Sequence, residues 1–142
     1  ESLRELAQQI APKNVVFTGA LSPDALRKEY AECNCFALPA IVDSKGDTEG
    51  LGVVLIEAMQ YGLPVVASDV GGIPDVVVSG ETGILVPEKN PQALADAFQK
   101  LESDPEMEAA LLKGAENRIA EYFNWNRIAE KQIAVYRRLL SR

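Results

Sequence analysis

Four short apolar runs, separated by stretches with helical signals, constrain the fold of this chain most strongly. The runs are residues 15–18, 33–38, 64–68 and 84–86, and the turns around them are rich in glycine and proline. Such runs are typical of buried strands. Strands that alternate with helices form parallel sheets, because a parallel connection needs a long crossover. The pattern predicts an α/β fold, a Rossmann-like parallel sheet of about four strands with helices on both faces.

The predicted helices carry recognisable start signals. Ser2 precedes an apolar stripe at i, i+3, i+4 and i+7, and Glu5 completes a capping box. Ser22 with Pro23 opens a helix that reaches about residue 32. The remaining helices are expected over about residues 51–61, in a short segment after Gly72, over 90–102, from 105 onward, and over 124–140.

The glycine-rich turns that follow these strands all fall on one edge of the predicted sheet. In an open parallel sheet, ligands bind outside the carboxyl ends of the strands. The segments predicted there are residues 19–22, 39–52 and 68–74, with Pro87 after the last strand. We therefore expect the functional site to lie along this edge.

Residues 47–58, D-T-E-G-L-G-V-V-L-I-E-A, are the most informative stretch on that edge. Gly50 and Gly52 allow the backbone to approach a ligand closely. The predicted helix that follows would present unpaired N–H groups and a positive dipole end. This arrangement favours an anion. Glu49 and Glu57 flank the turn, and no charged residue lies between Glu57 and Asp69.

Composition excludes several kinds of partner. A chain of 142 residues is the size of one domain, and its net charge of −7 disfavours nucleic acid and anionic membrane surfaces. No apolar run is long enough to span a bilayer. Cys33 and Cys35 are expected to be reduced core thiols facing the same way in one strand, which fits a cytoplasmic protein.

No metal or cofactor is expected. The chain has no histidine, and the acidic residues Asp43, Asp47 and Glu49 depart from the spacing of a calcium loop. The two glutamates could instead form a glycosidase-like acid and base pair, whose carboxyls flank one bond at roughly 5 to 10 Å. Eight residues of helix rise about 12 Å. Both carboxylates could flank one bond only if Glu49 folds back, so different roles are favoured.

Residues 47–77 and 80–87, together with V-V-F-T-G-A-L-S at 15–22, resemble the donor-site region of family-four retaining glycosyltransferases of the GT-B fold, the group that resembles glycogen synthase. The signature of that family is a pair of glutamates with seven residues between them. The similarity extends over nearly the whole chain, and the ordered set of blocks is much more specific than the glutamate pair alone.

The resemblance implies a role for each matching residue. Glu57 would accept hydrogen bonds from the ribose hydroxyls of a sugar nucleotide. Glu49 would be the catalytic-site residue that holds hydroxyls of the donor sugar; the alternative is a residue placed there by the helix dipole. The turn from Gly50, with the N–H groups of Leu51, Gly52 and Val53, would receive the pyrophosphate. Gly71 and Gly72 would lie near the sugar; the alternative is that they form only a turn. Leu21 would flank the base, although a helix that begins at Ser-Pro explains the residues around Leu21 equally well.

The resemblance also implies that residues 1–142 are a single donor-binding domain that is incomplete at its N-terminus, with 105–142 as its C-terminal helices. Family members add an N-terminal acceptor domain and cationic phosphate-binding residues, neither of which matches this chain. In the family strand order 3-2-1-4-5-6, the strand at 15–18 would lack its neighbours. It could pair beside residues 33–38, a second copy could fill the gap through an edge-mediated homodimer, or further residues could precede it.

Two hypotheses from different classes remain. The first is the donor domain of a retaining glycosyltransferase, a hexosyltransferase that uses a UDP-, GDP- or ADP-sugar, the isolated chain being inactive. The second is a non-catalytic module that binds a sugar nucleotide or a partner protein. A related epimerase is less favoured, because the paired glutamates and E-G-L-G turn are those of the transferases.

Overall fold

The computed structural model describes residues 2–141 and contains a three-stranded parallel sheet. The strands are β1 (Phe36–Leu38), β2 (Val65–Ser68) and β3 (Ile84–Val86), in the order β1-β2-β3. Phe36 pairs with Val65 and Val66 pairs with Ile84, so β2 is hydrogen-bonded on both sides. The α/β class and the parallel arrangement are confirmed.

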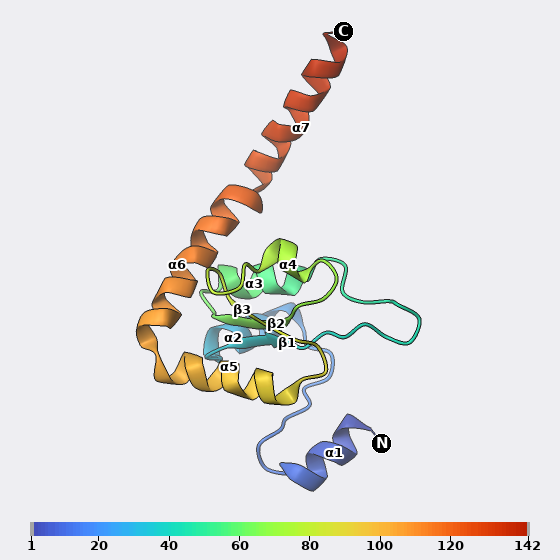
Figure 1. Ribbon diagram of the computed structural model, residues 1–142, viewed down its shortest axis with the longest axis vertical. Helices are drawn as coiled ribbons and strands as arrows, with labels where there is room; N and C mark the ends of the chain where they lie inside the picture. The colour runs from blue at the N-terminus through green and yellow to red at the C-terminus, as the bar shows by residue number, and fades with distance from the viewer. Residues whose placement is uncertain (1, 142) are drawn as a thin grey trace.

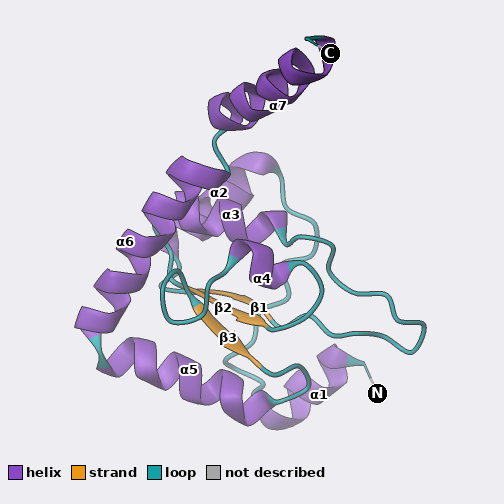
Figure 2. Cartoon of the chain, turned by 45° about the horizontal axis from the view of Figure 1, so that its top comes forward, coloured by secondary structure: helices purple, strands orange, loops and turns teal. Residues whose placement is uncertain are grey.

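Helices cover both faces of this sheet (Figures 1 and 2), as the sequence predicts. The helices α3 (Val53–Gln60) and α4 (Ile73–Val76) lie over one face, and α5 (Pro91–Ser103) lies against the other. The central strand explains the two-sided burial. Val65 and Ala67 belong to the core on the α3 side, whereas Val66 packs with residues of α5. All four residues of β2 are buried, as expected for a strand covered on both faces.

The helix start signals read from the sequence are confirmed. In α1 (Leu3–Ile10) the side chains of Ser2 and Glu5 form a reciprocal capping box, and Ser22 caps α2 (Pro23–Glu32). The same side-chain-to-backbone capping begins the three C-terminal helices, which are α5, α6 (Pro105–Tyr122) and α7 (Trp125–Leu140). These signals are reliable because a cap involves residues within one turn of each other.

The predicted strand at residues 15–18 is wrong, so the sheet has three strands rather than about four. This segment is not in the sheet, and the side chain of Val16 is 83% exposed. A β-branched run forms a strand only where it can pair and bury one face. Figure 1 shows the segment after α1 passing outside the layers, and none of the described strands pairs with it.

The predicted strand at residues 33–38 is shorter than expected. It begins at Phe36, because Cys33 is still the C-cap of α2. Cys33 is therefore exposed and is not a core thiol, while Cys35 is half-buried, so the expectation for this pair is wrong for Cys33. The alternation argument fails because the two residues do not lie in one strand.

Helix α7 continues beyond α6 and projects away from the sheet (Figure 1). None of its residues is buried, although its sequence is amphipathic. Among residues 2–141, no helix is both long and apolar enough to cross a membrane.

Candidate functional site

Two loops meet at the carboxyl ends of β1 and β2. The first runs from β1 to α3 and carries Glu49, and the second is the turn from β2 to α4 that carries Gly71 and Gly72. The backbone N–H of Gly72 donates to the carbonyl oxygen of Glu49 at 3.2 Å. The structure thus brings three of the predicted site residues together, across more than twenty residues of sequence.

This contact requires glycine on the second loop. A Cβ built on Gly71 would lie 2.2 Å from the carbonyl oxygen of Glu49, and one on Gly72 would lie 1.9 Å from that of Gly50. Gly71 also has φ +56°, in the left-handed region that favours glycine. The glycine pair is therefore more than a turn, since it allows the two loops to pack backbone against backbone.

The helix α3 begins one turn after Glu49. Its N-cap, Gly52, has φ +77°, and no side chain caps this end. The sequence places this helix start at residue 51, but the left-handed Gly52 delays it to Val53. In its first turn Val53 is 56% exposed whereas Leu55 is fully buried, so α3 packs on one side and leaves the other side open.

The backbone N–H groups at this turn are divided between two uses. The N–H of Gly52 donates to Oε1 of Glu49 at 3.1 Å, so the Glu49 carboxylate closes its own turn. In the described part of the chain, the N–H groups of Leu51 and Val53 have no protein acceptor. These two groups remain available to an external anion, at the positive end of the helix dipole.

Glu57 lies one turn further into α3, and its side chain is half-buried. The hydroxyl of Tyr30, in α2, donates to Oε2 of Glu57 at 3.3 Å. The ring of Tyr30 stacks on that of Tyr61 with centroids 5.0 Å apart. Burial, together with the neighbouring Glu57 carboxylate, raises the pKa of the Tyr30 phenol, so Tyr30 stays a protonated donor at neutral pH.

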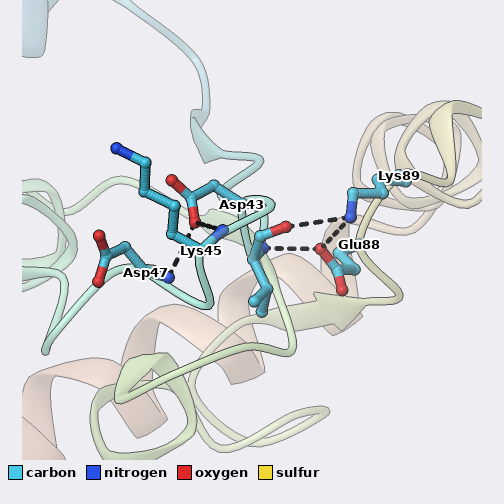
Figure 3. A network of polar contacts seen from close by, with 6 residues as sticks. Asp43, Lys45, Asp47, Glu88 and Lys89 are labelled. Atoms are coloured by element: carbon cyan, nitrogen blue, oxygen red, sulfur yellow. Dashed lines mark hydrogen bonds and ion pairs between the residues drawn. The ribbon is translucent and has the colours of Figure 1, made fainter.

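A polar network holds the outer part of the first loop (Figure 3). Both peptide groups of Val42 are engaged: its N–H donates to Glu88 at 2.8 Å, and its carbonyl oxygen accepts from Lys89 at 3.1 Å. Within the loop, Asp43 accepts from the N–H groups of Lys45 and Asp47 at 2.7 and 2.9 Å. The loop carrying Glu49 is thus fixed at its start, at its tip and at its contact with Gly72.

The remaining predicted site residue, Leu21, is only loosely connected with the others. It is half-buried just before the N-cap Ser22, and in the described chain no side-chain hydrogen bond joins either Leu21 or Glu57 to the contact between Glu49 and Gly72. Across residues 2–141, no three Cys, Asp or Glu side chains are grouped closely enough to hold a metal ion.

Sequence reasoning missed Tyr30 and the Glu88–Lys89 pair. Tyr30 fits the apolar face of its helix, and its partner Glu57 is 27 residues away. Val42 and Glu88 are 46 residues apart. Local patterns carry no signal for such contacts. The only available clue was the fold itself, which places every segment after a strand on one edge.

The groups along this edge of the sheet suit two kinds of ligand chemistry, an anion and hydroxyls. Free N–H groups and a helix dipole attract an anion, and half-buried carboxylates at both ends of the turn accept hydrogen bonds from hydroxyls. Comparison with known proteins assigns the chain to a family. Residues 1–118 match the family model described as glycosyl transferases group 1, and the chain belongs to this family.

The curated relatives are longer proteins. The GDP-mannose-dependent alpha-(1-6)-phosphatidylinositol monomannoside mannosyltransferase of Mycobacterium tuberculosis is 33% identical over 133 residues, which are 92% of this chain and 34% of that protein. A D-inositol 3-phosphate glycosyltransferase of Rhodococcus opacus is 37% identical over 138 residues, 96% of this chain and 29% of that protein. The chain spans about a third of the length of the curated relatives that it matches.

Solved structures agree with the family. Sucrose-phosphate synthase from Thermosynechococcus elongatus superposes with a TM-score of 0.78 at 35% identity, covering 96% of this chain and 33% of that one. HepE from Anabaena, in complex with UDP-glucose, gives 0.73 at 28% identity, covering 92% of this chain and 36% of that one. The structure neighbours are GT-B glycosyltransferases, and this chain corresponds to part of that fold.

Proposed function

We propose that this chain is the donor-binding part of a retaining glycosyltransferase that uses a nucleotide sugar. The observation that carries the proposal is the meeting of the Glu49 loop, the Gly71–Gly72 turn and the start of α3 at the carboxyl ends of the strands. Family membership supports glycosyl transfer. The complexes of HepE with UDP and with UDP-glucose support a nucleotide-sugar donor.

Each group at the site has a part in donor binding under this proposal. The ionised carboxylate of Glu57 accepts hydrogen bonds from ribose hydroxyls, and Glu49 accepts them from hydroxyls of the sugar. The N–H groups of Leu51 and Val53 receive the pyrophosphate at the N-terminus of α3. Because the Gly52 N–H already serves Glu49, it joins the pyrophosphate only if that carboxylate turns toward the sugar.

Transfer breaks the bond between the anomeric carbon and the phosphate oxygen, and forms a bond from that carbon to an acceptor oxygen. The nucleoside diphosphate leaves with the electron pair and takes up the proton that the acceptor hydroxyl gives up. Negative charge grows on the pyrophosphate as it departs, so N–H groups already aimed at it stabilise the transition state more than the ground state. The acceptor would be bound by a further domain of the complete enzyme.

Titration calorimetry with UDP-, GDP- and ADP-sugars tests this function, on this chain and on a longer natural chain that contains it. We expect one nucleotide class to bind and Glu57→Ala to weaken binding about 10- to 100-fold, the loss of hydrogen bonds to a charged group. Glu121→Ala, on an exposed position of α6, is the matched control and should bind normally. Unchanged affinity in Glu57→Ala would refute its assignment.

Activity separates this proposal from a module that only binds nucleotide sugars. A longer chain with the acceptor domain should transfer sugar with retained anomeric configuration, which NMR of the first-formed product reports. Binding without transfer in that chain would favour the binding module.

A further inference from the structure

The donor to Glu57 is a side chain that family membership and site motifs do not assign. Among residues 2–141, the only hydrogen bond to the Glu57 carboxylate comes from the Tyr30 hydroxyl, at 3.3 Å to Oε2. No lysine or arginine forms an ion pair with Glu57 in that part of the chain. The position of this carboxylate therefore depends on one phenol.

Tyr30 is itself held firmly. It is the buried residue of α2, with 6% of its surface exposed. Its ring stacks on Tyr61 with an interplanar angle of 13° and lies 5.7 Å from the ring of Phe36. A side chain fixed by two aromatic neighbours keeps its hydroxyl in one place, which is a requirement for orienting a second group.

The chemistry of the pair suits a carboxylate that must also bind a ligand. A phenol has one proton to donate, and an ionised carboxylate has about four acceptor sites on its two oxygens. Tyr30 uses one site on Oε2 and leaves Oε1 uncommitted. An arginine at this place could occupy both oxygens, and either an arginine or a lysine would neutralise the charge, in competition with ligand hydroxyls.

We propose that Tyr30 is a positioning residue that holds Glu57 for recognition of the ribose diol of the nucleotide donor. The inference rests on the proposed function, because it concerns the same ligand. It adds that selection of a ribose over a deoxyribose depends on α2 as well as on α3. Tyr30 acts through Glu57, so its removal should weaken the recognition of the ribose and not the binding of the phosphates.

The test measures how strongly four proteins prefer a ribonucleotide over its dideoxy analogue, a preference called ribose discrimination here. The proteins are the unsubstituted chain (the parent), Tyr30→Phe, Glu57→Ala and the double variant. Calorimetry is done with UDP, GDP and ADP, each paired with its 2′,3′-dideoxy analogue, and discrimination is the ratio of the two dissociation constants. Tyr30→Phe should lower discrimination about three- to tenfold, while affinity for the dideoxy analogue stays unchanged. Glu57→Ala should abolish it, and the double variant should match Glu57→Ala.

Tyr61→Phe is the matched control, because Tyr61 stacks in the same aromatic group, but in the described chain its hydroxyl makes no hydrogen bond to the Glu57 carboxylate; its backbone N–H, which donates to the Glu57 carbonyl oxygen at 3.2 Å, is unaffected by the substitution. It should keep full discrimination. A second measurement, urea unfolding of the same four proteins, detects the contact without nucleotide. The two single substitutions should be coupled by about three- to tenfold in the unfolding equilibrium constant.

The outcomes separate the inference from the proposed function. Loss of discrimination in Glu57→Ala but not in Tyr30→Phe would overturn the positioning role and leave the proposed function intact. An equal loss of affinity for both nucleotides of a pair in Tyr30→Phe, or zero coupling in unfolding, would also overturn it. Full discrimination in Glu57→Ala would refute the ribose role of Glu57 and the inference with it, whereas binding of none of the nucleotides would refute the proposed function.

Discussion

The carboxylate of Glu88, just after β3, accepts a hydrogen bond from the backbone N–H of Val42 at 2.8 Å, although 46 residues separate them in sequence. Lys89 lies 3.4 Å from the same carboxylate and binds the carbonyl oxygen of Val42 at 3.1 Å. The side chains of Glu88 and Lys89 therefore both bind the backbone of Val42, in the loop that carries Glu49 (Figure 3). The loop after β1 is fixed by the segment after β3.

Glu88→Ala should release this loop. The lost bond is charge-assisted and partly buried, so the substitution should cost about 1 to 3 kcal/mol of local stability. Hydrogen exchange at the Val42 amide, measured by NMR, should become faster by roughly tenfold or more, because 1.4 kcal/mol corresponds to a factor of ten. Nucleotide affinity should also fall, since Glu49 is on the same loop.

The matched control is Lys45→Ala on that loop, since only the backbone N–H of Lys45 takes part in the network. It should leave exchange at Val42 unchanged. Equal exchange in the Glu88→Ala variant and the parent would show that Glu88 does not anchor the loop.

Gly72→Ala should strongly destabilise the protein. Its Cβ would lie 1.9 Å from the carbonyl oxygen of Gly50, a backbone atom that moves only if the whole loop moves. Overpacking of this kind costs about 1 to 3 kcal/mol or more. Urea denaturation should show a lower midpoint with an unchanged slope.

Gly50→Ala is the control on the opposite side of the same contact. A Cβ there meets no atom within 4 Å, and Gly50 is not among the glycines with positive φ. Its effect should be within about 0.5 kcal/mol, as for ordinary surface substitutions. Similar losses in both variants would contradict the backbone-to-backbone packing described above.

The parts of the structure that were predictable from sequence depend on local interactions. Ser2, Ser22 and Asn90 each cap a helix through a bond to a residue three positions away, and the sequence shows both partners. The runs that became β2 and β3 are bounded by turn residues; β2 is buried throughout, and β3 is partly buried. The edge on which Glu49, Gly71 and Gly72 meet follows from parallel topology alone.

The parts that were not predictable depend on distant partners. Residues 15–18 have the composition of a strand, yet no neighbour in the described chain pairs with them. Cys33 follows the pattern of a buried strand but ends the preceding helix. Tyr30 looks like any core aromatic until Glu57 is placed beside it. The composition of a segment sets its preference for strand or helix, but the segments packed against it in the folded chain decide whether it adopts that structure.

Arg118→Met should destabilise the packing of α6 on α4. The guanidinium of Arg118 donates to the carbonyl oxygens of Val76 and Asp75 at 2.7 and 2.6 Å, and it lies 5.0 Å from the ring centre of Tyr122. Loss of charged hydrogen bonds should cost about 1.5 to 3 kcal/mol in urea denaturation. Arg127→Met, which removes only an exposed i,i+3 ion pair in α7, should cost less than about 1 kcal/mol. A similar cost for both would exclude a special role for Arg118.

Alkaline pH should destabilise the protein through Cys35. Burial raises the pKa of its thiol to about 11 from the usual 9.0, and the neighbouring Cys33 and Glu108 add to this effect. Between about pH 9 and 11 the folded state therefore keeps a proton that the unfolded state has lost. Stability must fall as pH rises through this range, because the folded state binds more protons.

Urea denaturation at pH 8, 9.5 and 11 measures this dependence in the parent, Cys35→Ala and Cys33→Ala. The decline should be shallower in Cys35→Ala, where the burial of that thiol no longer contributes, and only slightly shallower in Cys33→Ala, which removes the smaller effect of the neighbouring thiol and leaves the burial of Cys35 in place. Alkylation by iodoacetamide gives an independent reading, since only the thiolate reacts. At pH 8 the exposed Cys33 should react quickly and Cys35 slowly. A decline in Cys35→Ala as steep as in the parent would show that other groups cause the alkaline loss of stability.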